Sequence, residues 1–276
     1  MQGDDDRPLG FEEAPVHFAS GSQKARVTTE LWARRIGCPS CGAPTLDPLP
    51  NNSPVGDLRC PACREEYELK STKGRFGPRV ADGAYATMIQ RLAARNNPHL
   101  MLLSYDPFSR EATDLFVVPK HFFVLDLIEE RKPLAPTARR AGWIGCNINL
   151  SRVPQSGRII LLRDRQWMSR ESIRAQWDST VFLRDRTLEA RGWLLAVMKA
   201  VEAIGRPSFN LEDVYAAESR LQAIFPHNRN VRPKIRQQLQ VLRDQGYLEF
   251  VGRGAYRLGA PDALLAGALP GARRGA

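Results

Sequence analysis

The spacing of hydrophobic and polar positions predicts a mixed α/β region followed by a helical region. Short alternating or apolar runs typical of strands occur at residues 66–70, 100–105, 115–118 and 158–162. Apolar side chains recur at helical spacing in residues 22–36 and 81–94, so helices are expected there. The order of these elements predicts an α/β (α+β) domain over residues 11–182, within which the apolar segment 122–127 is ambiguous.

After a linker at about residues 181–190, the pattern becomes helical. Helices are expected at residues 193–204, 211–225 (as one helix or two) and 231–245, the last capped by Asn230 and ended by Gly246. Residues 247–258 follow as a small hairpin with Gly252, Arg253 and Gly254 at its tip. Helices followed by a basic-tipped hairpin predict a winged-helix domain over residues 188–258. Tails at residues 1–10 and 259–276 are expected to be unordered.

Composition narrows the class of protein. The chain has 276 residues with 40 Lys+Arg against 30 Asp+Glu, a net charge of +10 that favours a nucleic-acid partner. Its hydrophobic content of 43% is enough for a sizeable core. No apolar run is long enough for a transmembrane helix, and the acidic N-terminus lacks a signal-peptide pattern, so we expect a cytoplasmic protein without a membrane partner.

Four cysteines have the spacing of a zinc site. They form two C-x2-C knuckles separated by 18 residues, at Cys38, Cys41, Cys60 and Cys63. Two knuckles complete a tetrahedron of thiolates, which predicts structural zinc with no open coordination position. Disulfides or a chance spacing are the alternatives. Cys146 has no partner in the sequence and is expected to be a buried thiol.

A second group of residues suits catalysis by Mg²⁺. In a strand, Glu68 and Lys70 share one face, and antiparallel pairing with the preceding segment can bring Asp57 beside Glu68. Two carboxylates and the carbonyl of Leu69 are hard oxygen ligands that suit Mg²⁺, and a lysine can steady developing negative charge. Asp57, Glu68 and Lys70 therefore predict phosphodiester hydrolysis, with a solvated strand face and an ion pair as the alternative. Glu30 is a weaker candidate for an outer carboxylate.

The pattern of Asp57, Glu68 and Lys70 resembles the PD-(D/E)XK nucleases, and the embedded zinc module narrows the resemblance to the Dam-replacing proteins. That family includes Dpn-type Type II restriction endonucleases that cut adenine-methylated GATC. The resemblance covers about residues 22–258. Besides the knuckles and catalytic positions, it rests on residues 22–26, 30–32, 82–89 and, most specifically, 139–148 (RRAGWIGCNI). It implies a bacterial, Mg²⁺-dependent endonuclease domain with embedded zinc, followed by a winged helix, both of which read DNA.

DNA-contacting residues are expected in both regions. In the C-terminal region, the expected contacts lie on or beside the predicted helix 231–245, on the side opposite its apolar stripe, and at the hairpin tip. The helix and its flank carry Arg229, Arg232, Arg236 and Gln240, and the tip carries Arg253. A solvated face or a protein-binding surface is the alternative. Arg139 and Arg140 are expected to contact phosphates. The resemblance favours contact of Trp143 with the methyl groups of N6-methyladenine, whereas a core tryptophan is as consistent with the sequence.

Three functions therefore remain open. The first is a methyl-directed restriction endonuclease that acts on double-stranded DNA as a monomer in solution. The second is a non-enzymatic, zinc-containing winged-helix regulator in which Asp57, Glu68 and Lys70 are structural. The third is a structure-specific repair nuclease of the same fold.

Overall fold

The computed structural model describes residues 35–50, 56–94, 97–109 and 111–259, and these form two compact units. The described parts of the first unit lie within residues 35–78, 94–120 and 158–177, and those of the second within residues 79–93, 121–157 and 178–259. The predicted tail 1–10, residues 260–276, Glu30 and most of the expected helix 22–36 lie outside the described residues. Ile36, the expected end of that helix, is not helical.

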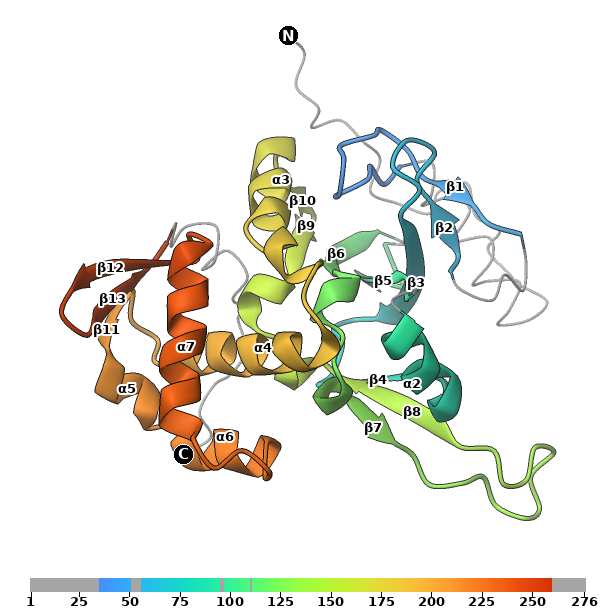
Figure 1. Ribbon diagram of the computed structural model, residues 1–276. Helices are drawn as coiled ribbons and strands as arrows, with labels where there is room; N and C mark the ends of the chain where they lie inside the picture. Colours follow the sequence, from blue (N-terminus) through green and yellow to red (C-terminus); the bar gives the residue numbers. More distant parts are fainter. Residues whose placement is uncertain (1–34, 51–55, 95–96, 110, 260–276) are drawn as a thin grey trace, which may run out of the picture. The chain divides into compact units, whose positions relative to one another are not determined.

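The first unit contains a seven-stranded mixed sheet (Figure 1). Its strands, in spatial order, are β1 (Asp47–Pro48), β2 (Leu58–Arg59), β3 (Glu66–Lys73), β5 (His99–Tyr105), β6 (Ala112–Val118), β9 (Ile159–Arg163) and β10 (Gln166–Trp167). Strands β3 and β5 are parallel and the other neighbours are antiparallel. All four predicted strands are present. The apolar run at residues 100–105 does not alternate with polar residues because β5 is buried along its whole length.

One face of this sheet carries the core of the first unit. Tyr67, Met101 and Val117 project into it from three neighbouring strands, and Trp177 of helix α3 (Arg170–Asp178) packs against the same cluster. The sequence pattern did not predict α3. Its nine residues are mostly polar and bury only Gln176 and Trp177, and the Gln176 side chain accepts a hydrogen bond from the Ile160 amide of β9 at 3.0 Å.

The second unit begins with a three-stranded antiparallel sheet in the order β4 (Arg79–Ala84), β8 (Gly145–Asn149), β7 (Ile128–Glu130). Helix α2 (Tyr85–Ala94) follows β4, so the prediction of a helix from residue 81 was wrong by four residues. Residues 81–84 pair with β8 instead, with a bulge between Asp82 and Ala84. Short 3-10 turns occupy Lys120–Phe122, Leu125–Leu127, Leu150–Arg152, Gln155–Gly157 and Val181–Leu183.

The C-terminal part of the second unit combines helices with a small sheet. The helices are α4 (Leu188–Ala203), α5 (Leu211–Tyr215), α6 (Glu218–Ile224) and α7 (Val231–Asp244). Strands β11 (Ser208–Asn210), β12 (Leu248–Gly252) and β13 (Ala255–Leu258) form a sheet in the order β11-β13-β12. The expected hairpin is confirmed, and β11 adds a third strand. No helix in the described part of the chain has the length and apolar character needed to cross a membrane.

Local capping explains the boundaries of these helices. The side chain of Thr187 accepts a hydrogen bond from the Ala190 amide, so α4 begins inside the segment that we expected to be a linker. Gly246, with φ of +72°, ends α7 as predicted. Asn230 occupies the N-cap position of α7 as expected, but its side chain makes no capping hydrogen bond. The backbone N–H of Asn230 donates to the side chain of Asn228, at Oδ1, at 2.8 Å within the preceding turn.

Candidate functional site

The four cysteines of the two knuckles converge at one end of the first unit. The Sγ atoms of Cys38, Cys41, Cys60 and Cys63 all lie within 4.8 Å of one another, with separations of 3.6 Å for Cys38–Cys63 and for Cys41–Cys60. Thiolates on a tetrahedral zinc ion at about 2.3 Å are separated by roughly 3.8 Å, so the cluster fits this ion and could hold it. Burial raises the pKa of the Cys38 thiol, and the charge of a bound cation is what would favour its thiolate.

Asp57, Glu68 and Lys70 also come together in the first unit. Strand β2 pairs antiparallel with β3, with Leu58 opposite Tyr67, and this register continues to place Asp57 beside Glu68. The Leu69 amide donates to Asp57 Oδ2 at 2.8 Å, and Lys70 Nζ donates to Glu68 Oε1 at 2.7 Å. Two carboxylates and one ammonium group thus occupy the arrangement that the sequence predicted.

The surroundings of this cluster are less exposed than those of an ordinary surface ion pair. Asp57 is half-buried, and burial raises its pKa more than the Leu69 amide and the Lys70 charge lower it. The side chains of Glu68 and Lys70 retain only 26% and 21% of their exposure, so their ion pair is poorly screened by water. A divalent cation beside Asp57 would favour the ionised carboxylate and offset the cost of its burial.

The second unit presents Trp143 on the long connection between β7 and β8. In this connection, residues 131–144, backbone hydrogen bonds join Leu134 to Trp143 and Arg131 to Gly145 at 3.0 Å each. Trp143 is half-buried and is not among the buried core residues, and the Arg140 guanidinium lies 4.7 Å from its ring centroid. An ideal Cβ at Gly145 would lie 2.7 Å from two indole carbons, so the absence of a side chain at Gly145 gives the ring its place.

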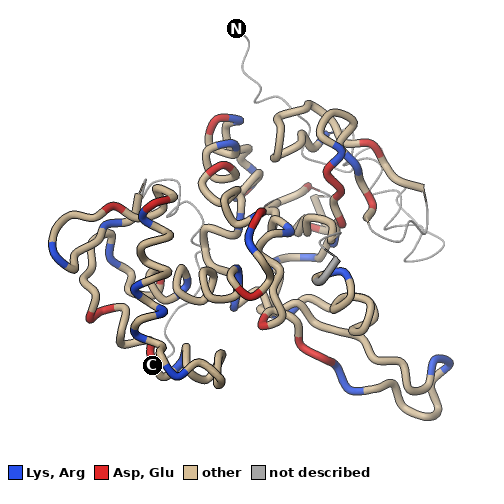
Figure 2. The backbone as a smooth tube through the Cα atoms, viewed as in Figure 1, with Lys and Arg blue, Asp and Glu red and all other residues tan. Residues whose placement is uncertain are grey.

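Basic residues of the second unit gather on this connection and on the helix-and-hairpin region (Figure 2). Arg139, Arg229, Arg236, Gln240 and Arg253 are exposed, and their side chains make no hydrogen bond or ion pair within the part of the chain that the structure describes. Arg232 differs, because it donates to Glu218 at 2.8 Å and lies 4.9 Å from the Tyr215 ring centroid. Of the two arginines on α7 expected to contact DNA, Arg236 is therefore the more available for a ligand.

Comparison with known protein families identifies two consecutive regions. Residues 12–186 match the model of the Dam-replacing family, and residues 189–258 match the Dam-replacing HTH domain. The chain belongs to the Dam-replacing family. This confirms the resemblance seen in the sequence, and the matched helix-turn-helix domain contains α7 with the exposed Arg236 and Gln240. Family membership and this domain together imply that the protein binds DNA.

The structure also shows residues beside the cysteine cluster and Glu68 that the sequence did not single out. Tyr67, beside Glu68 in the chain, is buried on the other face of β3, and its hydroxyl lies 3.1 Å from Cys38 Sγ. Behind it, Glu65 contacts His99 Nε2 at 3.0 Å and Lys120 Nζ at 2.6 Å. Burial opposes ionisation of Glu65, but these two partners outweigh it and lower its pKa to about 2. Tyr67 follows the second knuckle by four residues, and this was the only signal for it in the sequence.

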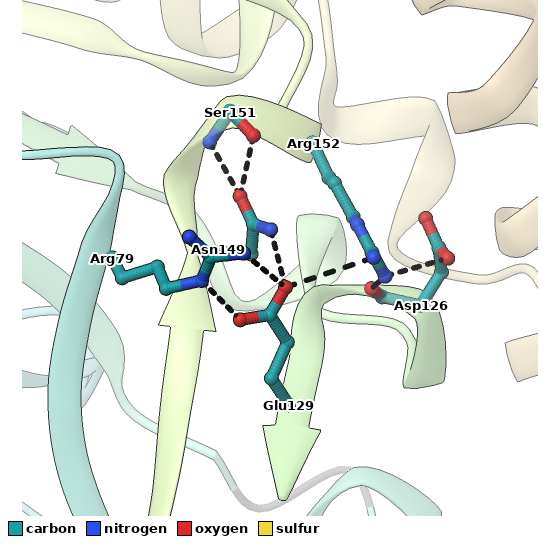
Figure 3. Close-up of polar contacts among 6 residues, drawn as sticks. All are labelled: Arg79, Asp126, Glu129, Asn149, Ser151 and Arg152. Atoms are coloured by element: carbon teal, nitrogen blue, oxygen red, sulfur yellow. Dashed lines mark hydrogen bonds and ion pairs between the residues drawn. The ribbon is translucent and has the colours of Figure 1, made fainter.

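A network of hydrogen bonds and ion pairs, also not predicted from the sequence, links the strands at the start of the β7–β8 connection. Glu129 of β7 accepts hydrogen bonds from Arg79 Nε at 2.5 Å and from Asn149 Nδ2 at 2.6 Å, and it pairs with Arg152 at 3.6 Å (Figure 3). Arg152 also contacts Asp126 Oδ1 at 3.0 Å. The Arg79 hydrogen bond lowers the pKa of Glu129. The network joins β4, β7 and β8, and so fixes the start of the connection that bears Trp143.

Proposed function

We propose that this chain is a Mg²⁺-dependent restriction endonuclease of the PD-(D/E)XK type that hydrolyses double-stranded DNA at N6-methyladenine-containing GATC sites. The observation that carries the proposal is the joint placement of Asp57, Glu68 and Lys70, linked through the Leu69 amide. The basic, exposed faces of the second unit and membership of the Dam-replacing family support DNA as the substrate.

In this proposal, the carboxylates of Asp57 and Glu68 and the carbonyl of Leu69 would hold Mg²⁺. When bound, the ion would supply Lewis-acid polarisation of the phosphate and a more acidic water. The Leu69 amide, by donating to Oδ2, would orient the Asp57 carboxylate that holds the ion. Lys70 would release its bond to Glu68 and stabilise the negative charge that develops on the phosphate.

The knuckle cysteines would hold zinc in a structural role, because four thiolates leave no coordination position for a substrate. Cys60 and Cys63 lie between β2, which follows Asp57, and β3, which carries Glu68. Zinc at this position would therefore fix the connection between the two carboxylates.

Recognition of the methylated site is proposed for both the hairpin and the winged helix. Trp143 is held by Gly145 and Arg140 with part of its ring exposed, which suits contact with methyl groups in the major groove. Arg139 and Arg140 would contact phosphates beside it. Arg236 and Gln240 would read base edges from α7, with Arg229, Arg232 and Arg253 on the surrounding backbone.

A digest separates this function from its alternatives. Plasmid DNA with and without adenine methylation at GATC is incubated with Mg²⁺ and either wild-type protein or Asp57→Asn. Discrete fragments from methylated DNA alone, lost in the variant while a gel shift persists, are the expected result. A gel shift without cleavage by the wild-type protein would instead favour a regulator, and cleavage confined to flaps or mismatches would favour a repair nuclease.

A further inference from the structure

Tyr67 connects the cysteine cluster with the proposed catalytic strand. Its side chain is fully buried, with 0% exposure, on the face of β3 opposite to Glu68. The phenol oxygen lies 3.1 Å from Cys38 Sγ, and the ring stacks at a tilt on His99 with 5.0 Å between centroids. Tyr67 is thus placed by packing as well as by its hydroxyl.

The chemistry of the two groups fixes the direction of this hydrogen bond when zinc is bound. A zinc-bound cysteine is a thiolate and can only accept, whereas a tyrosine hydroxyl keeps its proton at neutral pH and can donate. Groups that hold a ligand atom from outside the coordination shell orient it, and their loss commonly weakens metal binding about 10–100-fold. The Tyr67 hydroxyl meets these requirements toward Cys38.

The backbone around Tyr67 carries the same connection to Asp57. The Asp57 amide donates to the Tyr67 carbonyl at 2.9 Å, and the Leu69 amide donates to Asp57 Oδ2 at 2.8 Å. These two bonds enclose Glu68, so a shift of β3 would change the positions of both carboxylates. Gly56 permits this close approach, since an ideal Cβ there would lie 3.1 Å from the Tyr67 carbonyl oxygen.

We propose that Tyr67 is a positioning residue that donates a hydrogen bond to the zinc-bound Cys38 thiolate and thereby couples the zinc centre to the geometry of Asp57 and Glu68. The proposal rests on the proposed nuclease function for its second half only. The link to zinc stands or falls separately, because metal binding is measured without DNA.

The decisive comparison is between Tyr67→Phe and the wild-type full-length protein. Zinc transfer to a chromophoric chelator should show an affinity about 10–100-fold lower in the variant. With Co²⁺ in place of zinc, the thiolate-to-metal absorption band should move to longer wavelength, since a thiolate without this hydrogen bond is a stronger electron donor. Tyr105→Phe, which removes another buried tyrosine hydroxyl from the same core, should change neither property.

A second replacement at the same position keeps the test valid if the Tyr67→Phe variant fails to fold. Replacement of Tyr67 by 3-fluorotyrosine keeps the ring and hydroxyl but makes the phenol a stronger hydrogen-bond donor. The cobalt band should then move to shorter wavelength and zinc release should slow. A band and a release rate equal to those of the wild-type protein in either replacement would overturn the zinc half of the proposal.

Cleavage measured at saturating zinc tests the coupling. Tyr67→Phe should lower kcat while leaving KM for methylated DNA within twofold of wild type, since the DNA-contacting residues of the second unit are untouched. Weaker zinc binding with an unchanged kcat would overturn the coupling. A wild-type protein that cuts no DNA would refute the nuclease function, and the zinc and cobalt measurements would still decide the role of Tyr67 at Cys38.

Discussion

Replacement of Lys70 by Met separates the proposed role of the ammonium group from those of the carboxylates. The Lys70–Glu68 contact of 2.7 Å corresponds to an attraction of about 6 kcal/mol at an effective dielectric constant of 20 and about 1.5 kcal/mol in water. Desolvation offsets much of this attraction, so the net loss of free energy of unfolding should be about 1–3 kcal/mol in the metal-free protein. Met retains most of the buried aliphatic volume, which limits the loss to the charge.

The catalytic effect of the same change should be larger and should have a distinct signature. Loss of one charge-stabilising group commonly lowers kcat by about 10²–10³-fold, or roughly 2.7–4 kcal/mol. The Mg²⁺ affinity should stay the same or rise, because Glu68 loses its competing cation. Glu68→Gln should instead weaken Mg²⁺ binding.

Single-turnover cleavage at varied Mg²⁺ measures the rate and the affinity together, and urea unfolding without Mg²⁺ measures stability. Lys73→Met is the matched control, because Lys73 is an exposed lysine on the same strand. Unchanged cleavage by Lys70→Met, or a loss of Mg²⁺ affinity equal to that of Glu68→Gln, would refute the assigned role.

Four further predictions concern single residues. Because burial raises the Asp57 pKa in the folded state, the metal-free protein should lose stability as pH rises through and above the ordinary aspartate range; Asp57→Asn should flatten this dependence in urea unfolding at several pH values. Gly145→Ala should displace Trp143 and reduce the ratio of methylated to unmethylated cleavage, whereas Gly83→Ala, with no atom within 4 Å of its ideal Cβ, should not; equal ratios would count against the placement of Trp143. Arg236→Ala should cost about 1–3 kcal/mol of DNA affinity in a binding titration, and the ion-paired Arg232 should cost less when replaced by Ala. Glu202→Gln should lower the free energy of unfolding by about 1–3 kcal/mol in the same urea assay, because Glu202 accepts from the Gln155 and Ser156 amides at 2.6 and 3.1 Å and from the Tyr247 hydroxyl at 2.9 Å.

The sequence predicted those parts of the site whose members lie close together in the chain. The spacing of the two C-x2-C knuckles alone predicts a metal cluster. Alternation of side chains along a strand is enough to place Glu68 and Lys70 on one face. The position of Asp57 required one further step, antiparallel pairing across a short connection. The structure has this pairing between β2 and β3.

Other features depend on contacts between distant segments, and no local pattern encodes them. Residues 81–84 have the spacing of the helix that follows, yet they pair with β8, more than 60 residues away. Helix α3 is too polar to show a helical apolar stripe. The Glu129 network joins residues from position 79 to position 152, and each of its members is an ordinary surface residue in the sequence.

Ligand chemistry keeps the two proposed metal centres distinct although both adjoin strand β3, through Tyr67 on one side and Glu68 on the other. Soft thiolates at the knuckles favour zinc, whereas carboxylate and carbonyl oxygens at Asp57, Glu68 and Leu69 favour Mg²⁺. Tyr67 and Glu68 are adjacent on β3 and project to opposite faces, so the sheet itself separates the centres. Zinc above the amount needed to fill the cysteine cluster can still compete for the carboxylates, since divalent zinc binds most protein sites more tightly than Mg²⁺. If the proposed function holds, we therefore expect excess zinc to inhibit cleavage and added Mg²⁺ to relieve the inhibition; an absence of this inhibition would count against an ion held by Asp57 and Glu68.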